Sequence, residues 1–559
     1  MSRIRSPGSA VARLPTILRT VVHLRPAQIA AQFRYAISGL PSPVRLSGPA
    51  PSLAIAMPVS GFPDPPPHVV SRGGSTIELL SLPIDLALPI DWSTTARGPL
   101  FAYHLHQHEF VRLPVFSPSE RAAILEDWIA NHRRGIGWDP HPISLRLICW
   151  AKLLGSRGLL PDSPGLREMI LSSMADQAET LSRGLETRLQ ANHLLSNLIG
   201  VVLAGIVLEG SRSAAWRERS DLLVRELERQ IHPDGGHEER SPMYHALLLE
   251  ALLDLQAFCR AAPGVVPRGL LECLQEKTRA MFRALQVLTH PDGRIALFSD
   301  SALGIASEPS TLRAYAGRLG LPVETEAPGS DCLPQTGYVR FRAAPFDLIA
   351  SVSGPAPPHQ PGHAHCDALA FELSVDGLRL VTDTGVFEYR PGARRDHART
   401  TASHATLQFD GAEQAEIWAA HRVGGRPTVA LTAWDAEGSA EATCRGWSRE
   451  APLHRRRFVV APDGVSITDR IEGSYSEVRS RLPIDPAWTV HLEGNRAWAH
   501  RPSHEGPGAR VAIGLPDAFE WSLERGPYYP TFGREVERFI LCGRASRVVG
   551  DAIIRFRKE

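Results

Sequence analysis

The chain has 559 residues, of which 43% are hydrophobic and 22% are charged. This composition is ordinary for a folded globular protein, and it excludes the collagen-like, disordered and disulfide-scaffold classes. With 61 Lys and Arg against 60 Asp and Glu, the net charge is +1, so no overall field would recruit nucleic acid or a membrane, and we expect no nucleic acid as a partner. The length predicts roughly three or four domain-sized units.

The seven cysteines are an odd number, lie far apart and form no CxxC pair, which indicates reduced or buried thiols rather than a disulfide framework. The longest apolar run, Leu198 to Leu208, is too short for a membrane-spanning helix of about 20 residues. The N-terminus is basic but lacks the apolar core and cleavage site of a secretory signal. We therefore expect no transmembrane segment and no such signal. The location stays open between cytoplasm and cell envelope, and the oligomeric state is undetermined.

Residues 1–90 form a basic, proline-rich N-terminal segment. No Asp or Glu occurs before Asp64. Because proline fixes φ and removes a donor, we expect loops around one short amphipathic stretch, Leu18 to Ser38, which Pro26 interrupts. The basic residues suit either an anionic polymer or membrane surface, or a solvated face, which is the more common meaning of such a run. These arginines are Arg3, Arg5, Arg13, Arg19, Arg25, Arg34 and Arg45.

Residues 91–328 are predicted to form a helical domain. From about Ser117 the apolar residues follow the helical period, and Ser119 is placed to cap the first such helix. Glycine and proline clusters separate the further helices, and hairpins repeated in this way either stack as a solenoid or close into a ring. The expected helices are Ser144–Leu154, Leu166–Ser182, Arg188–Leu208, Ser213–Ile231, Ser241–Ala261 and Leu270–Leu288.

Residues 329–559 are predicted to be antiparallel β structure. Short alternating or buried β runs, joined by turn signals such as Asp376-Gly377 and Asp463-Gly464, replace the helical pattern. Helices and strands in separate blocks indicate a multidomain α-then-β protein with a cleft between the parts. The clearest strands start at Tyr338, Phe346, Ala370, Leu378 and Phe458.

Histidines and an aspartate gather in the first part of the β region. His363 and His365 are two residues apart, so in an extended strand they would point to the same side. Asp383 ends the following strand, and His404 lies a little beyond it. His365, Asp383 and His404 offer the nitrogen and oxygen ligands that zinc takes, with a coordination position left for water. The alternative is a set of hydrogen-bonded surface histidines.

Two polar groups mark helix starts in the helical region. Asn192 and His193 come early in one predicted helix, and Tyr244 lies in the first turns of another, after a glycine turn. Such positions can present polar side chains to a ligand, although a capping amide, a surface histidine and a core-edge tyrosine would look the same. No GxSxG, phosphate-loop, dinucleotide-binding or HExxH motif occurs, so hydrolase, kinase and dehydrogenase functions lose their usual support.

The sequence resembles the heparinase II/III-like family of polysaccharide lyases over most of the chain after about residue 90. The resemblance implies an incomplete (α/α) toroid followed by an antiparallel β-sandwich domain, with the active site between them. It departs from the family at Ala405, where relatives commonly carry Asn, and at Cys366 within the His-rich motif. The segments that carry it are Trp138–Arg146, Asn192-His193, Asp234–Tyr244, His363–Ala368, Asp383–Gly385 and Arg399–His404.

The resemblance also implies a carbon–oxygen lyase that cleaves uronic-acid-containing polysaccharide by β-elimination. In this scheme Asn192 and His193 neutralise the uronate carboxylate, while Tyr244 and His363 act as base and acid, in an order that the sequence does not decide. Zinc on the predicted ligands would mainly order the strands around His363.

The resemblance implies an acidic polysaccharide as substrate, whose identity stays open, with a slight preference for a bacterial exopolysaccharide. Basic residues predicted near the cleft would suit it. A zinc-dependent glycan hydrolase and a non-catalytic acidic-polysaccharide-binding protein linked to exopolysaccharide production remain as alternatives. The basic residues are Arg240, Arg394, Arg395 and Arg399.

Overall fold

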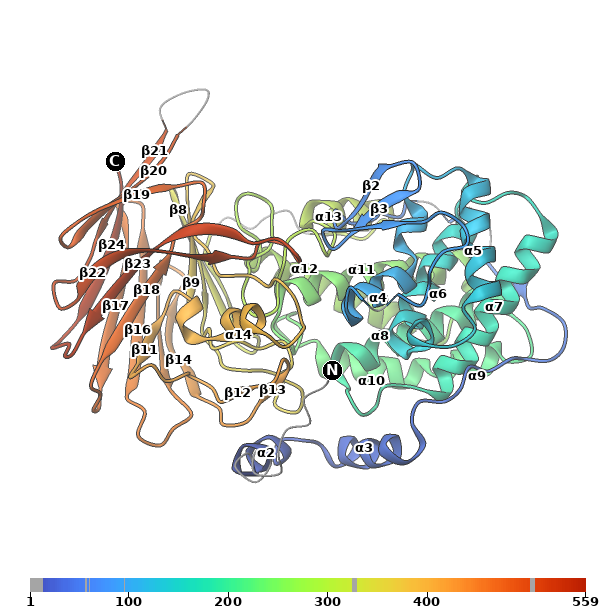
Figure 1. Cartoon of the computed structure of the whole chain (residues 1–559), viewed down its shortest axis with the longest axis horizontal. Helices are drawn as coiled ribbons and strands as arrows, with labels where there is room; N and C mark the ends of the chain where they lie inside the picture. Colours follow the sequence, from blue (N-terminus) through green and yellow to red (C-terminus); the bar gives the residue numbers. More distant parts are fainter. Residues whose placement is uncertain (1–13, 56–57, 60, 95, 324–328, 503–507) are drawn as a thin grey trace.

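The computed structural model describes residues 14–55, 58–59, 61–94, 96–323, 329–502 and 508–559. Helices make up one half of the molecule and strands the other (Figure 1). The last helix of the first half ends at Arg318, and the strands of the second half begin at Asp331. The prediction of a helical N-terminal part followed by antiparallel sheets is thus confirmed.

The helical part is built around α8, which is buried along almost its whole length and packs against α6, α7, α9, α10 and α11. Most helices carry proline in the first turn, where its missing N–H costs nothing. The helices are α4 (Pro99–Gln107), α5 (Pro118–Asn131), α6 (Pro140–Gly155), α7 (Pro164–Arg183), α8 (Ala191–Val207), α9 (Ser213–Arg217), α10 (Ser220–Gln230), α11 (Pro242–Ala261), α12 (Leu270–Val287) and α13 (Pro309–Arg318).

Three local predictions in this part were wrong. Ser117, not Ser119, caps α5: its hydroxyl accepts from the Glu120 amide at 3.3 Å, and the Glu120 carboxylate accepts from the Ser117 amide. This reciprocal pair is a capping box. The single helix predicted over 213–231 is divided into α9 and α10, and α4 and α13 were not predicted.

The N-terminal segment is more regular than its proline content predicts. Pro26 does not interrupt a helix but begins α3, while α2 precedes it. A three-stranded sheet follows and packs near α4. Arg3, Arg5 and Arg13 lie outside the described residues. The elements are α2 (Leu14–Val21), α3 (Pro26–Ser38), β1 (Ser52–Leu53), β2 (Val69–Gly73), β3 (Thr76–Leu79) and β4 (Leu82–Asp85).

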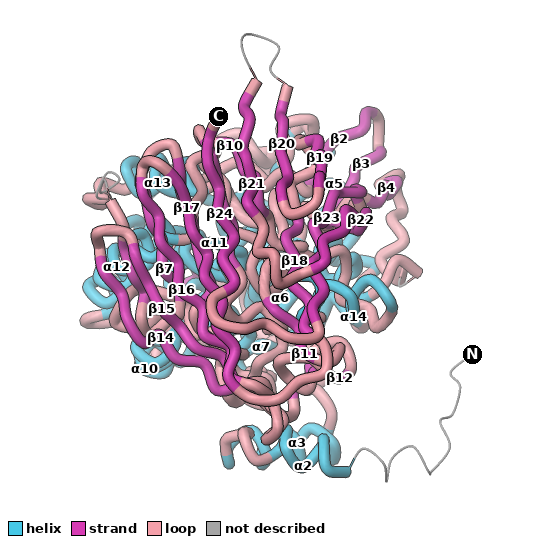
Figure 2. The backbone as a smooth tube through the Cα atoms, turned by 90° about the vertical axis from the view of Figure 1, so that its left-hand side faces the viewer, coloured by secondary structure: helices cyan, strands magenta, loops and turns pink. Residues whose placement is uncertain are grey.

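The largest sheet of the β part has eight strands in the order β14-β15-β16-β17-β24-β21-β20-β19, and Figure 2 looks onto it. Alternate residues of β15 to β17 are buried, as expected for a sheet with one face on a core. The strands are β14 (Thr428–Asp435), β15 (Ser439–Arg445), β16 (Leu453–Ala461), β17 (Gly464–Glu472), β19 (Thr489–Glu493), β20 (Arg496–Arg501), β21 (Ala509–Gly514) and β24 (Ala552–Lys558).

A five-stranded sheet, β10-β9-β8-β7-β6, and a four-stranded sheet, β11-β18-β23-β22, complete the β part with the small pair β12-β13. Phe371, Phe458 and Leu541, one from each of the three larger sheets, belong to a single buried cluster. The remaining strands are β6 (Asp331–Leu333), β7 (Tyr338–Ala343), β8 (Phe346–Ser351), β9 (Phe371–Val375), β10 (Leu378–Val381), β11 (Leu407–Phe409), β12 (Ile417–Trp418), β13 (Arg422–Val423), β18 (Val478–Pro483), β22 (Glu520–Tyr528) and β23 (Val536–Ala545).

Buried polar contacts join the helical and β parts. The Asp234 carboxylate accepts from the backbone amides of Gln335 and Thr336, both at 2.8 Å. A Cβ on the neighbouring Gly236 would lie 1.9 Å from the Thr336 hydroxyl, so only glycine allows this close approach. His290 and Glu372 pair across the same boundary at 2.8 Å. The two parts therefore meet in a fixed geometry, and side chains from both converge along this boundary.

Candidate active site

Three of the predicted catalytic residues converge where the helical and β parts meet. Asn192 lies in the first turn of α8 and Tyr244 in the first turn of α11, whereas His363 lies in the loop between β8 and β9. The Tyr244 and His363 rings are 4.0 Å apart between centroids. The Asn192 amide nitrogen lies 3.3 Å from His363 Nε2. One monosaccharide could contact all three side chains.

The backbone turns sharply just before Asn192, because Gln190 and Ala191 have φ values of 60° and 48°. α11 begins after Ser241, whose hydroxyl accepts from the Tyr244 amide at 3.2 Å. Both helices therefore direct their N-terminal ends to the site. The positive end of a helix dipole stabilises an anion placed there, so the backbone itself favours a carboxylate ligand.

Glu239 fixes the orientation of Asn192. The Asn192 side-chain nitrogen donates to the two Glu239 oxygens at 2.9 and 2.7 Å, and the carboxylate is buried. Since one amide hydrogen is directed to Glu239, the other is available to His363 or to a ligand. Glu239 was not among the residues predicted from the sequence, although it lies within the Asp234–Tyr244 segment.

His193 is the source of positive charge in the site. Its Nδ1 lies 3.1 Å from a Glu186 carboxylate oxygen. Burial alone would lower the pKa of His193, but the Glu186 charge outweighs burial and raises this pKa above its usual value. Burial would likewise raise the pKa of Glu186, yet the positive His193 brings it down to about 2. Each member of the pair thus favours the charged form of the other, a carboxylate on Glu186 and an imidazolium on His193.

His363 is held as a proton acceptor by Asp300, which lies in the loop between α12 and α13. His363 Nδ1 donates to one Asp300 oxygen at 2.9 Å, and His365 Nε2 donates to the other at 2.9 Å. Arg395 pairs with both oxygens. Burial would raise the pKa of Asp300, but Arg395 and the two histidines hold it well below its usual value. With Nδ1 protonated toward this carboxylate, Nε2 of His363 carries the lone pair that faces Asn192.

The prediction that His363 and His365 share one face of a strand was wrong. Both lie in an irregular loop, and they converge because each bonds a different oxygen of the same carboxylate. Asp300 was not selected from the sequence. Asp300 follows the apolar run from Ile295 to Phe298 after one serine. This position could have indicated a buried charge, which needs partners inside the protein.

Tyr244 is protonated in its surroundings. Its hydroxyl lies 3.0 Å from the Tyr389 hydroxyl. Burial raises the pKa of Tyr244 far above its usual value, and this effect outweighs the hydrogen bond with Tyr389, which lowers it. Tyr389 lies in the loop after β10, and no motif or spacing in the sequence marks it.

The predicted zinc ligands form a second group beside His363. His365, Asp383 and His404 are buried, and each offers a ligand atom within 4.8 Å of the others. His404 Nδ1 lies 2.8 Å from Asp383, while His365 Nδ1 and His404 Nε2 are buried without a hydrogen-bond partner among the described residues. Two unsatisfied imidazole nitrogens next to a carboxylate fit the donor set that zinc takes.

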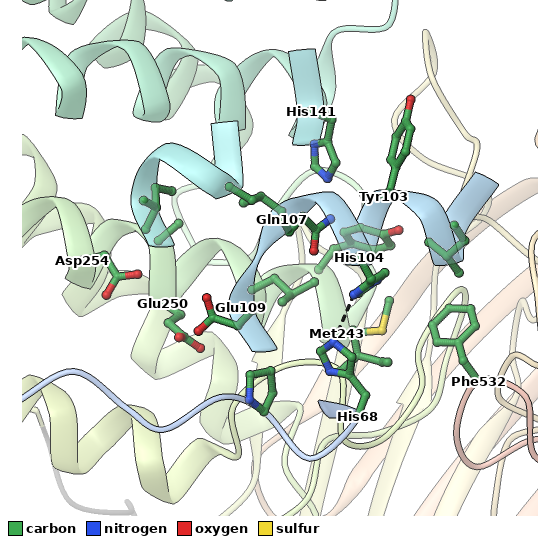
Figure 3. A pocket seen from close by; sticks show the side chains of 18 of the residues that line it. His68, Tyr103, His104, Gln107, Glu109, His141, Met243, Glu250, Asp254 and Phe532 are labelled. Atoms are coloured by element: carbon green, nitrogen blue, oxygen red, sulfur yellow. Dashed lines mark hydrogen bonds between the residues drawn. The ribbon is translucent and has the colours of Figure 1, made fainter. Parts of the chain in front are cut away.

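A cavity of about 160 Å³ opens beside Tyr244 and Tyr389 and extends into the helical part. Figure 3 shows its polar wall, where His68 and His104 are hydrogen-bonded to each other at 3.0 Å. At the far end Lys152 pairs with Asp254 at 2.6 Å. A cavity of about this size has room for one six-membered ring.

Two family models match most of the chain. "Heparinase II/III N-terminus" matches residues 129–317, and "Heparinase II/III-like, C-terminal" matches residues 325–555. The chain belongs to the heparinase II/III-like family. The residues gathered at the boundary come from both matched regions, with Asn192, His193 and Tyr244 in the first and His363 in the second.

Among curated relatives, a heparin-sulfate lyase of Pedobacter heparinus is 27% identical over 315 residues, which is 51% of this chain but only 47% of that enzyme. FtsZ-localized protein C of Caulobacter vibrioides is 24% identical over 503 residues, covering 85% of this chain and 81% of that protein. A crystal structure of heparinase III is 15% identical and has a TM-score of 0.69, covering all of this chain and 87% of the solved one. The last likeness concerns the fold.

The four arginines predicted near the cleft are bonded to other groups of the protein and do not present free charges to the candidate active site. Arg395 and Arg399 are buried, the first against Asp300 and the second against the Ala364, Ala419 and Arg422 carbonyls. Arg240 donates to the Gly354 carbonyl, and Arg394 pairs with Glu535. For Arg395 and Arg399 the prediction that they face an acidic polymer was wrong, because their buried guanidinium groups satisfy internal acceptors.

Replacing Asp300 by Ala should destabilise the protein by about 3–5 kcal/mol, because Arg395 would remain buried without its partner. The measurement is the free energy of unfolding in urea. Asp162→Ala is the matched control: this exposed aspartate pairs only with Arg167, so its loss should cost less than about 1 kcal/mol. Equal effects of the two substitutions would contradict the role assigned to Asp300.

Proposed function

We propose that this protein is a polysaccharide lyase that cleaves a uronic-acid-containing polysaccharide by β-elimination between C5 and O4. The observation that carries the proposal is the meeting of Asn192, Tyr244 and His363, with His363 Nε2 as a proton acceptor and Tyr244 as a protonated donor. The heparin-sulfate lyase among the relatives supports the same class of reaction.

We further propose that the helical part, residues 91–328, is the incomplete (α/α) toroid of the family, and that residues 329–559 form its antiparallel β-sandwich domain, with 1–90 as an N-terminal segment. The central position of α8 among its neighbours supports the first assignment. The common buried cluster between the large sheets supports the second.

The first requirement of the reaction is a neutralised carboxylate. The C5 hydrogen lies next to the uronate carboxylate and becomes acidic only when the charge that develops there is stabilised. The His193 imidazolium, the Asn192 amide and the two helix N-termini supply this stabilisation. Glu186 and Glu239 keep the two side chains oriented without occupying the groups that would face the sugar.

The second requirement is a base for C5 and an acid for O4. We assign the base to His363, since Asp300 holds its Nδ1 as a donor and leaves the Nε2 lone pair toward the site. We assign the acid to Tyr244, whose raised pKa keeps the phenol protonated. On elimination the C5 proton passes to His363, the C5 electron pair forms the C4–C5 double bond, and O4 leaves with the proton of Tyr244.

The arrangement also favours one configuration of the uronate. Because the His363 and Tyr244 rings lie against each other, the two proton transfers take place on one side of the sugar ring. The C5 hydrogen and O4 lie on the same side in glucuronate and mannuronate and on opposite sides in iduronate, galacturonate and guluronate. We therefore propose glucuronate or mannuronate polymers, bacterial exopolysaccharides included, as the substrate class. The cavity beside Tyr244 would receive the sugar that departs with O4.

Tyr244→Phe should lower kcat by about 10²–10⁴-fold, because the leaving oxygen loses its proton donor, while the fold remains intact. The measurement is ultraviolet absorbance of the new double bond, on polymers of glucuronate and mannuronate. Tyr475→Phe, in the β part away from the site, is the matched control and should keep full activity.

Unchanged activity of Tyr244→Phe would remove this residue from the mechanism. Saturated products would indicate the zinc-dependent hydrolase instead. Tight binding of an acidic glycan without any product would indicate a non-catalytic binding protein.

The pH dependence should report on His193. Its pKa is raised in the folded protein, so the imidazolium is present at and below its usual pKa of about 6.5 and is lost as the pH rises through the raised value. We therefore expect kcat/KM to decline on the alkaline side, and this decline should be absent in His193→Gln, which should be slower at every pH. If the alkaline decline of kcat/KM persists in His193→Gln, a group other than His193 causes it.

We also propose that His365, Asp383 and His404 bind one zinc ion. Zinc would neutralise the Asp383 charge and hold together the loops before β9, after β10 and before β11. Two buried nitrogens without a partner among the described residues support the proposal. The zinc would influence the active site by holding the loop that carries His363 and His365. The proton transfers themselves remain with His363 and Tyr244.

Protein supplied with zinc should contain about one zinc per chain, and chelation should lower its melting temperature. His404→Ala should lose the metal and melt at the lower temperature with or without chelator. His491→Ala is the control, since His491 is exposed on β19, and it should keep both the metal and the melting temperature. Metal-free protein whose stability is unaffected by added zinc would contradict the proposal.

A further inference from the structure

The two N-terminal helices turn their apolar sides away from the protein. Leu14, Leu18 and Val21 of α2 follow helical spacing, Val22 comes directly after the helix, and all four are exposed. The exposed fraction reaches 56% for Leu18 and 74% for Val22. α2 has no buried residue. A helix on a globular protein normally places such an apolar face on the core and its polar face in water.

The polar side of α2 is the side that contacts the rest of the protein. Thr16 donates to Glu416 at 2.7 Å, and Arg19 Nε donates to the same carboxylate at 2.7 Å. The Trp418 indole donates to the Thr20 hydroxyl at 3.1 Å. These contacts fix the helix on the β part with its apolar side outward.

α3 repeats the same orientation. Gln28 and Ala31 are buried against the protein, and the Gln28 amide donates to the His359 carbonyl at 3.3 Å. On the outward side Phe33 and Ile37, one helical turn apart, are 68% and 86% exposed. In Figures 1 and 2, which are related by a quarter turn, both helices lie at the same lower edge of the molecule.

Exposed large hydrophobic side chains are concentrated in this segment. Of the 15 such residues in the described part of the chain, 8 lie within residues 14–37. Large exposed apolar patches on a soluble domain usually mark an interaction site. They are Leu14, Ile17, Leu18, Val21, Val22, Phe33, Tyr35 and Ile37.

The charge of the segment that contains α2 and α3 indicates which kind of partner its apolar surface would bind. No Asp or Glu precedes Asp64, although the whole chain has a net charge of only +1. Two acids of the protein body pair with arginines of this segment, Glu416 with Arg19 and Asp176 with Arg45. Arg25, which contacts the neutral Gln190, and the exposed Arg34 therefore leave this edge with a local positive charge. A second copy of the segment would bring like charges together, whereas anionic phospholipid headgroups complement them.

We propose that α2 and α3 attach the protein to the surface of an anionic phospholipid membrane, with Leu18, Val22, Phe33 and Ile37 inserted among the lipids. The helices lie in the interface, as basic amphipathic helices do. Within the described residues, none of the helices has both the length and the apolar character needed to span a bilayer. Attachment through α2 and α3 would leave the candidate active site, where the helical and β parts meet, outside the lipid.

The test uses the full chain and vesicle flotation. Wild type should bind vesicles of phosphatidylglycerol and phosphatidylcholine at least about tenfold more tightly than vesicles of phosphatidylcholine alone, because basic residues add affinity for anionic lipid. Leu18→Glu with Phe33→Glu should weaken binding by at least about tenfold. Val549→Glu is the matched control, because Val549 is 76% exposed at the other end of the sequence; its binding should equal wild type.

Thermal unfolding should be the same for all variants because the substituted side chains are exposed. If the double variant does not fold, Val22→Glu with Ile37→Glu serves in its place. No wild-type binding to the anionic vesicles, or equal loss in Val549→Glu, would overturn the proposal. A wild-type dimer in sedimentation equilibrium that the double variant breaks, without vesicle binding, would assign the surface to self-association instead.

Discussion

A single buried carboxylate, Asp300, connects the parts of the candidate site. It comes from the segment after α12, yet its partners His363, His365 and Arg395 all belong to the β part. An ionised group can be buried only when its charge and hydrogen-bonding capacity are satisfied. The same contacts that satisfy Asp300 set the tautomer of His363 and orient His365, one of the ligands of the proposed zinc ion. Domain assembly and the chemistry of the site thus rest on the same interaction.

The other charged groups of the candidate site together favour an anionic ligand. Each group proposed to face the substrate carboxylate is neutral or positive, and two acids orient these groups by accepting hydrogen bonds from them. Glu186 holds His193 and Glu239 holds Asn192, while two helix N-termini add their partial positive charge. The environment therefore favours the negative charge that an elimination develops. Tyr244 stays protonated for the same reason: its surroundings contain acids and little solvent.

The proposed membrane segment is physically linked to the site. Arg25, just before α3, donates to the Gln190 side chain at 3.0 Å, and Gln190 belongs to the sharp turn before Asn192. Gln28 contacts the loop that leads to His363 through the His359 carbonyl. A protein held at a membrane by α2 and α3 would therefore present its site at a defined position relative to the lipid surface.

Much of the secondary structure could be predicted from the sequence, because apolar periodicity and helix-breaking residues act locally. The helices α6, α7, α8, α11 and α12 and the strands β7 to β10 lie close to their expected positions. The choice of Ser119 over Ser117, and the interruption predicted at Pro26, failed because proline begins helices as readily as it interrupts them. The strands β2 to β4 occur where loops were predicted. The site residues Asn192, His193, Tyr244 and His363 stood out through motifs that resemble a family.

Asp300, Glu239 and Tyr389 could not be identified in this way, since their importance comes from neighbours that are distant in sequence. The buried arginines show the same limit: the sequence records a charge, but its burial and its partner depend on folding. The sequence by itself determined the order of helices and strands and the types of side chain available for the chemistry. The tertiary structure alone decided which of them face one another, which proton each carries and which side of an amphipathic helix is exposed, because burial and pairing are properties of the assembled fold.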